Sequence, residues 1–300
     1  MMNNINGWLN INKNLGISSM KAVSIIKRIL KPGKIGHAGT LDPLATGVLP
    51  MAIGAATKLI EFCMDSIKIY RFTVKMGQIT DTLDAEGEIL DTTLYIPSQK
   101  ELEDACIKFT GVISQVPPNF SALKINGVRA YKLARQTDVE FQIAARNIHI
   151  HKLALINYNE EAQTAEFLTT CSKGTYIRSL ARDIMESCKS LGYVLELTRQ
   201  AVGNFNLDNA INIEELQKLD LVVARNLLLN KIVMVEQILF ANNIKQIEIT
   251  ENEALKVRYG QSLELDTCDE AIVWLSLKNQ LVSVGSIKNN NFIINKTFNL

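Results

Sequence analysis

The sequence predicts an α+β protein with a small β-rich domain at its C-terminal end. Three observations support this class. Apolar residues recur at helical spacing in several segments that begin at serine residues. Other segments alternate apolar and polar residues, as half-buried strands do. Beyond about Ala241 the chain changes to short β-like runs, IKQIEIT, AIVWLSL, LVSVGSI and NFIINKTF. We therefore expect a large domain over residues 1–240 and a small one over residues 241–300.

The first elements can be read in order along the chain. Residues 8–11 are expected to form a short strand. Ser18 and Ser19 are good helix N-caps, and Pro32 and Gly33 follow the apolar stripe of that helix. Lys68–Met76 alternates apolar and polar residues over its whole length and is expected to be a half-buried strand.

The later elements follow the same logic. Residues 97–101, PSQKE, contain a capping box and should open a helix that ends near Gly111. Residues 166–172 alternate as a strand, and Gly174 then marks a sharp turn into another helix. Gly192 is expected to end that helix, and residues 195–205 are expected to form a further strand.

Composition restricts the possible partners and cellular settings. The 300 residues are 47% apolar and carry a net charge of +1, so any surface for nucleic acid must be local. Residues 1–41 contain six lysine or arginine residues and no acid, although a solvated helix face would look the same. The five cysteines are scattered without a CxxC pair, which predicts reduced thiols, a cytoplasmic setting and no zinc site. We expect no secretory signal and no membrane span.

The segment Lys34–Thr57 stands out because it combines four glycines and two prolines with a single acid, Asp42. Glycine and proline at this density fix an irregular backbone path. A lone carboxylate on such a loop, followed by apolar sequence, is a candidate nucleophile or base. An ordinary Asp-Pro turn is the alternative interpretation.

Two other clusters could suggest metal sites. Asp81, Asp84 and Glu86 lie close together, but their spacing does not fit a calcium loop. His149 and His151 share one face of an expected strand, but the sequence offers no further ligands beside them. We therefore expect no metal site and interpret the two histidines as surface residues or as strand residues with satisfied hydrogen bonds.

Basic and aromatic residues are interleaved in the segment Val116–Arg135. This pattern suits RNA, which offers phosphates and unstacked bases, whereas a hairpin with solvated lysines is equally compatible with it. The residues concerned are Lys124, Arg129, Lys132 and Arg135 together with Phe120 and Tyr131.

Four stretches resemble the TruB-type tRNA pseudouridine synthases, in the same order as in that family. They are GHAGTLDPLATGVLP at residues 36–50, the segment from Tyr70 to Gly87, VPPNFSALKINGVRAYKLAR at residues 116–135, and CSKGTYIRSLARDI at residues 171–184. The resemblance covers roughly Gly7 to Phe205. It implies the pseudouridine synthase fold, a mixed and largely antiparallel sheet with flanking helices and a central active-site cleft.

The resemblance also implies a domain organisation. Residues 1–240 would form the catalytic domain, in which about residues 116–150 are an insertion that folds over the tRNA elbow. Residues 241–300 would form a PUA-like RNA-binding domain. No specific motif supports the PUA-like assignment, and an ordinary β extension of the first domain is the alternative.

The implied activity is conversion of the uridine at position 55, in the tRNA T-loop, to pseudouridine. The implied partner is tRNA, the enzyme would act as a monomer, and no cofactor is expected. Asp42 would supply the carboxylate, either by attacking the nucleoside or by abstracting a sugar proton. Asp42 must be ionised for either step, and Arg178 opposite it would favour the ionised form.

The resemblance assigns roles to four further residues. Tyr70 would stack on the target base and could take the C5 proton late in the reaction. Tyr176 and Leu197 would line the pocket and keep water from the intermediate. His37 would fill the place that the flipped base vacates.

The sequence departs from the family at a few positions. Asn12 and Asn14 replace the acid and the proline of a usual Asp-Lys-Pro turn, although Lys13 remains. Phe120 replaces a tyrosine, and residues 197–200, Leu-Thr-Arg-Gln, lack the usual paired arginines.

Two other classes of function were weighed. The first is a non-catalytic RNA-binding or tRNA-folding protein that uses the same basic surfaces. The second is a phosphate-handling enzyme that uses the glycine-rich loop, which is disfavoured because that loop lacks the GK[ST] ending of a P-loop.

Overall fold

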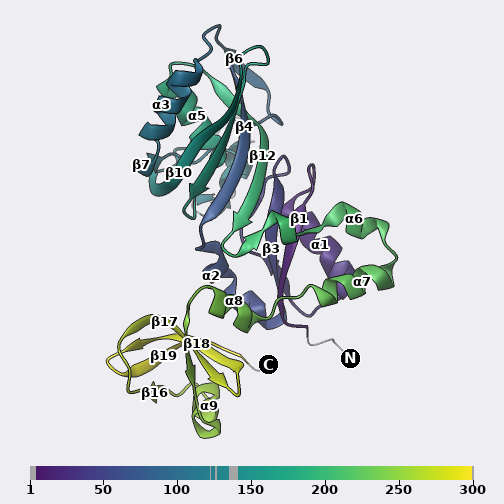
Figure 1. Cartoon of the computed structure of the whole chain (residues 1–300), viewed down its shortest axis with the longest axis vertical. Coiled ribbons are helices and arrows are strands. Elements are labelled where there is room, and N and C mark those ends of the chain that lie inside the picture. Colours follow the sequence, from purple (N-terminus) through teal and green to yellow (C-terminus); the bar gives the residue numbers. More distant parts are fainter. Residues whose placement is uncertain (1–4, 122, 126, 135–140, 299–300) are drawn as a thin grey trace.

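The structure, a computed structural model, describes residues 5–121, 123–125, 127–134 and 141–298. Figure 1 shows an elongated molecule, with a large sheet and its helices at one end and a smaller sheet, coloured yellow, at the other. Arg135 of the predicted basic segment lies outside the described residues.

Within the described chain, ten strands form one mixed sheet. Its main path runs β14 (Ile211–Asn212), β1 (Gly7–Lys13), β3 (Thr46–Ile53), β12 (Gly192–Val202), β4 (Lys68–Met76), β11 (Thr164–Cys171), β10 (Arg146–Asn159) and β7 (Gly111–Gln115). Strand β2 (Ile35–His37) pairs with β3, and β13 (Phe205–Asn206) pairs with β12. Neighbouring strands are antiparallel, except that β14 is parallel to β1 and β12 is parallel to β3. The expected mixed, largely antiparallel sheet is therefore confirmed.

Strand β3 is buried on both faces, which explains its continuous apolar sequence. Leu49 and Met51 belong to the main core cluster, which includes the apolar stripe of helix α1 (Ser19–Leu30). Val48 and Ala52 point the opposite way and belong to a second cluster. The loop that carries Asp42 runs directly into this strand and is therefore anchored in the most deeply buried part of the sheet.

The predicted helix starts are confirmed. Ser18 caps α1 by accepting a hydrogen bond from the Lys21 amide, and Ser98 and Glu101 form the capping box of α3 (Gln99–Lys108). Helix α3 and helix α5 (Ile177–Ser187) pack against the half of the sheet that contains β10, β4 and β12 (Figure 1).

The predicted end of α5 is wrong. The helix stops at Ser187, and the left-handed residue that follows it is Lys189, with φ 58°. Gly192 is instead the first residue of β12. A Cβ there would lie 2.4 Å from Met185 Cγ and 2.9 Å from Val74 Cγ1. The glycine is therefore needed for close packing between strand and helix rather than for a helix cap.

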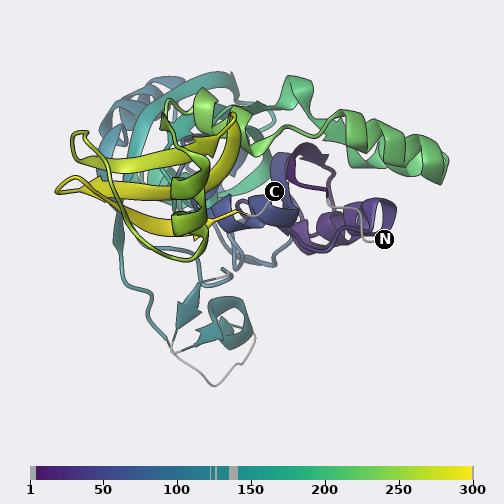
Figure 2. The ribbon, with the colours of Figure 1, turned by 90° about the horizontal axis from the view of Figure 1, so that it is seen from below.

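Shorter elements complete the large unit. They are η1 (Gly54–Leu59), α2 (Ile60–Met64), β5 (Gln78–Thr80), β6 (Ile89–Thr92), β8 (Lys124–Ile125), β9 (Val128–Arg129), α4 (Ala130–Ala134), η2 (Leu207–Asn209), α6 (Ile213–Lys218) and α7 (Leu221–Asn230). Figure 2 shows the hairpin β8–β9 and helix α4, coloured teal, projecting away from the two sheets. The predicted insertion thus has its own small structure.

The C-terminal β-like runs are confirmed as strands. A five-stranded sheet, counted over the described residues, has the order β15 (Lys245–Glu248), β17 (Glu270–Leu277), β18 (Gln280–Lys288), β19 (Asn291–Thr297) and β16 (Leu263–Glu264). Helices α8 (Val235–Ala241) and α9 (Glu251–Arg258) pack against it. This curled sheet fits a PUA-like domain.

The two units share apolar packing. Trp274 and Leu281 of the small sheet belong to the same cluster as Trp8 of the large sheet. The expected domain boundary at residue 240 falls within α8, and its exact position remains a prediction.

Candidate active site

Asp42 lies in a cleft of about 920 Å³. The lining comes from the loop before β3, from β4 and β12, from the turn before α5 and from the insertion. Five of the six residues that the sequence singled out line this cleft, namely Asp42, Tyr70, Tyr176, Arg178 and Leu197. Segments far apart in the sequence therefore meet around one carboxylate.

Local contacts hold the Asp42 loop in place. The Ala45 amide donates to the Asp42 carbonyl across an Asp-Pro turn. Ser19, buried at the start of α1, accepts from the Leu41 amide at 2.8 Å and donates to the Leu41 carbonyl at 3.0 Å. The loop is both a turn and the support of a candidate catalytic group.

Lys13 gives the loop a second anchor. Its ammonium group is completely buried and donates to the carbonyls of Asn14, Ile17 and Pro43. Burial lowers the pKa of Lys13 to about 8, while the nearby Asp42 charge opposes this shift.

The departure at Asn14 is compensated locally. The Asn14 amide group donates to Glu214 Oε2 at 3.2 Å, and its oxygen accepts from the Glu214 amide. The turn that lacks the usual proline is thus tied to the first turn of α6.

Arg199 fixes the other side of the loop. Its guanidinium is 1% exposed and donates to the carbonyls of Val48, at 2.7 Å, and Gly39, at 2.9 Å. Gly47, on β3, allows the backbone of Arg199, on β12, to lie close to it. Its φ is +101°, and a Cβ there would lie 2.3 Å from the Arg199 carbonyl oxygen.

Arg178 joins three segments around Asp42. Its guanidinium lies 2.8 Å from Asp42 Oδ2 and 3.2 Å from Asp84 Oδ2. It also donates to the carbonyls of Thr82 and Phe120. The Arg178 side chain is only 6% exposed, whereas that of Asp42 is 39% exposed and can meet a substrate. The contact from Phe120 uses its backbone, so a missing tyrosine hydroxyl does not affect it.

The acid cluster after β5 supports this ion pair. Asp84 accepts hydrogen bonds from the Thr82 hydroxyl, at 2.6 Å, and from the Glu86 amide, at 3.1 Å. Asp81 accepts from the amides of Thr82 and Glu88. No group of three metal-ligating side chains that could hold an ion occurs among the described residues.

Tyr70 and Leu197 belong to the apolar part of the lining, and both are buried. Burial raises the pKa of the Tyr70 hydroxyl, and the Arg199 charge partly opposes that shift. A neutral phenol at this position can stack on a base without carrying a charge into the pocket.

His37 is placed differently from the other predicted site residues. It ends β2, opposite Met51 of β3, and is not part of the cleft lining. Burial, together with the Arg199 charge, lowers the pKa of His37 below its usual 6.5. Its Nδ1 is buried and has no hydrogen-bond partner among the described residues. A neutral imidazole beside the loop can therefore act by shape and stacking.

Tyr176 is held through its backbone. The buried side chain of Gln115 donates to the Tyr176 carbonyl at 3.1 Å and accepts from the Tyr176 amide at 2.8 Å. The Arg146 guanidinium lies 4.8 Å from the centre of the Tyr176 ring. The aromatic ring is thus fixed at the cleft wall, two residues before Arg178.

The lining is electropositive. Among the described residues that line the cleft, the cations are Lys68, Arg129, Arg146, Lys173, Arg178 and Arg199, and the carboxylates are Asp42 and Asp65. Such a surface attracts a polyanion, although only its local charge is positive and the whole chain is near neutral.

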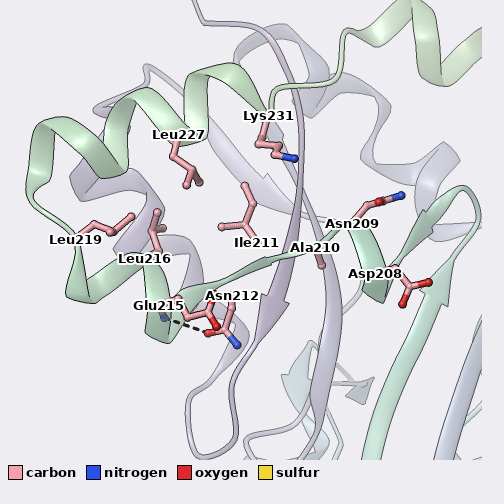
Figure 3. A pocket seen from close by; sticks show the side chains of 10 residues that line it. All are labelled: Asp208, Asn209, Ala210, Ile211, Asn212, Glu215, Leu216, Leu219, Leu227 and Lys231. Carbon is pink, nitrogen blue, oxygen red and sulfur yellow. Dashed lines mark hydrogen bonds between the residues drawn. The ribbon is translucent and has the colours of Figure 1, made fainter.

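A second pocket of about 420 Å³ lies under α6 and α7, away from these groups. Figure 3 shows Ile211, Leu216, Leu219 and Leu227 gathered between the two helices and the adjoining strand. None of the predicted site residues lines it. Separately, no helix in the described part of the chain combines the length and apolarity needed to cross a membrane.

Sequence reasoning missed four supporting residues, namely Lys13, Asp84, Gln115 and Arg199. Lys13 and Asp84 were noticed as part of a turn and of an acid cluster, but nothing local indicated that they would be buried. Gln115 stands beside a proline-rich segment, and Arg199 is embedded in a strand. Only the three-dimensional contacts identify these residues.

Comparisons with known proteins agree with this arrangement. Residues 27–177 match the family described as "TruB family pseudouridylate synthase (N terminal domain)". A protein of Rickettsia akari named tRNA pseudouridine synthase B is 45% identical over 98% of this chain and 99% of its own length. A protein of Rickettsia bellii with the same name is 45% identical over 98% of both chains.

Solved structures share the fold. A chain in a "Cbf5-Nop10-Gar1 Complex" superposes with a TM-score of 0.69 and 20% identity, over 97% of this chain and 84% of that one. A chain in an "H/ACA RNP bound to a substrate RNA containing 2'-deoxyuridine" gives a TM-score of 0.69 with 19% identity, over 98% and 85%. At 45% identity over nearly the full length, the relatives show that this chain belongs to the TruB family of pseudouridylate synthases.

Proposed function

We propose that this pseudouridine synthase acts on tRNA, converting the uridine at position 55 of the T-loop to pseudouridine, with Asp42 as the catalytic carboxylate. The observation that carries the proposal is the setting of Asp42. It stands on an anchored loop in a cation-lined cleft, and its carboxylate is bound by the buried Arg178.

The names of the relatives support the choice of tRNA. Proteins of Rickettsia akari and Rickettsia bellii that match nearly the whole chain are named tRNA pseudouridine synthase B. The alternative of a non-catalytic RNA-binding protein gains no support from them. The Asp42 carboxylate also contributes nothing to phosphate binding, so RNA binding alone does not explain its place in the cleft.

The reaction requires a carboxylate at the sugar or the base and a pocket that holds the detached uracil. The N1–C1′ bond breaks, the uracil rotates, and C5 bonds to C1′ while the C5 hydrogen leaves as a proton. Asp42 either attacks the nucleoside or removes a sugar proton, and both steps need the carboxylate in its ionised form. Arg178 contacts the Asp42 carboxylate at 2.8 Å and would hold it in position for either step.

The apolar lining would hold the detached base. Tyr70 and Leu197 are buried beside Asp42, and Tyr176 stands on the cleft wall. In this proposal Tyr70 stacks on the uracil and relays the C5 proton late in the reaction, taking it up as its own hydroxyl proton leaves to solvent, so that the phenol stays neutral. Tyr176 and Leu197 keep water from the intermediate while the base rotates.

The target uridine must leave its stack to reach the cleft, which costs on the order of a few kcal/mol. We propose that His37, on the strand that leads into the Asp42 loop, occupies the space the base leaves. Its lowered pKa keeps the ring neutral near pH 7, so it would act by filling space and stacking.

The wider setting is part of the same proposal. The enzyme would work as a monomer in the cytoplasm. The insertion at about residues 116–150 would contact the tRNA elbow, and residues 241–300 would form a PUA-like RNA-binding domain. The projection of β8, β9 and α4 from the body supports this use of the insertion.

The test uses tRNA transcripts made with uridine tritiated at C5. The wild-type chain should release one tritium per tRNA and leave pseudouridine at position 55. A transcript with cytidine at position 55 should release none. Equal release from both transcripts would contradict the choice of site, and no release from either would contradict the activity.

A further inference from the structure

His149 and His151 form an exposed pair of rings on the outer face of β10. Their ring centres are 4.1 Å apart and their planes differ by 38°. Residues two apart on a strand share a face, so the pairing follows from the strand geometry. The described residues offer no third metal ligand beside them. A metal site among the described residues therefore does not explain the two exposed imidazoles in contact.

The pair adjoins the Asp42 cleft. His149 lines the cleft together with Val112, which faces it across the β7–β10 pairing. The His149 amide donates to the Ser172 hydroxyl, which fixes the backbone at this point. Arg146, three residues earlier on β10, also lines this cleft. His151 lies next to His149 and extends the aromatic surface beyond the cleft.

We propose that His149 and His151 form a stacking platform for an RNA nucleotide next to the flipped uridine. This inference rests on the proposed function, because it assigns a further part of the substrate to the same cleft. A cleft of about 920 Å³ has room for more than the target nucleotide. RNA-binding proteins hold unstacked bases on the faces of aromatic side chains, including histidine.

The surroundings favour a nucleic acid over other ligands. Val112, 70% exposed, offers apolar contact beside the rings. Arg146 and Lys173 line the same cleft and supply positive charge for the phosphates that accompany a base, and Lys173 also pairs with Asp65 at 2.8 Å. Apolar contact, ring faces and cations together match one nucleotide, and the contact would be insensitive to base identity because every base has a face to stack.

The test compares variants of the full chain on an unmodified tRNA transcript. The equilibrium Kd and the single-turnover rate of pseudouridine formation at saturating enzyme are measured separately. The variants are His149→Ala/His151→Ala and His149→Phe/His151→Phe. The control is Asn157→Ala, which changes an exposed residue of β10 outside the cleft lining.

The alanine pair should raise the Kd by about 5- to 100-fold, the loss expected when a base–aromatic stack is removed. Its saturated rate should stay within about twofold of the wild type. The phenylalanine pair keeps the ring faces and should bind within about twofold of the wild type, as should Asn157→Ala.

An unchanged Kd in the alanine pair would overturn the inference. Equal losses in the alanine and phenylalanine pairs would also overturn it, because the rings would then not act by stacking. Failure of the proposed function would look different, since the wild type would bind the transcript without forming pseudouridine.

Discussion

Replacing Arg178 with methionine should damage both stability and catalysis. The guanidinium is bound to two carboxylates, Asp42 and Asp84, and to two backbone carbonyls. Asp84 has a side chain only 4% exposed. Without Arg178 it would be a buried charge whose remaining hydrogen bonds, within the described part of the chain, come from Thr82 and Glu86, and breaking such a pair typically costs about 3–5 kcal/mol.

The catalytic loss can be worked out from the contact to Asp42. A hydrogen bond to a charged group contributes about 1.5–3 kcal/mol, so its loss should slow the single-turnover rate by roughly 10- to 100-fold. The free energy of unfolding is measured by urea denaturation and the rate by tritium release at saturating enzyme.

The double variant Arg178→Met/Asp84→Asn separates the two effects. It removes the unpaired charge, so it should be more stable than Arg178→Met alone, while remaining slow. Arg182→Met is the matched control, because Arg182 lies one turn further along α5 and pairs with Asp183 and Glu186 nearer the surface. Full activity of Arg178→Met at neutral pH, or a double variant no more stable than the single one, would refute the reasoning.

Three further predictions concern the supports of the site. His37→Ala should raise the tRNA concentration needed for half-maximal rate more than it lowers the saturated rate, and an unchanged concentration dependence would count against a role in flipping. The pKa of Lys13 falls from 10.5 unfolded to about 8 folded, so the unfolded state binds more protons between these values. The unfolding free energy of the wild type should therefore rise relative to that of Lys13→Met between pH 8 and 10.5, by at most about 1.4 kcal/mol per pH unit. A constant difference between the two unfolding free energies across this pH range, measured by urea denaturation, would contradict the prediction. Gly47→Ala should cost about 2 kcal/mol or more, because the new Cβ would meet the Arg199 backbone, whereas Gly33→Ala, with open space around it, should be nearly neutral in the same denaturation series.

Local sequence chemistry predicted the framework well because it depends on neighbours in the chain. Strand alternation in β4 and the capping box at Ser98 and Glu101 are short-range signals, and both are confirmed. The loop around Asp42 was recognisable from its glycines and prolines. The expectation that Arg178 would lie opposite Asp42 came with the family resemblance.

The remaining contacts depend on tertiary packing, which leaves no local pattern. Lys13 carries a charge that is usually exposed to water. Its burial is explained by hydrogen bonds to the carbonyls of Asn14, Ile17 and Pro43, which a local pattern does not reveal. In the sequence, Asp84 is one of three acids that lie close together. Its ion pair with Arg178 depends on the tertiary fold. Gly192 has the residue type of a helix cap, but its role is set by Met185 and Val74, which pack against it.

The most direct test of the account compares tritium release by the wild type and by Asp42→Asn, on the same tRNA labelled at uracil C5. The substitution keeps the shape of the side chain and removes the charge that Arg178 binds. The account predicts release by the wild type alone, with both proteins still binding the tRNA. Release by Asp42→Asn at a rate close to that of the wild type would contradict the role of Asp42 as the catalytic carboxylate.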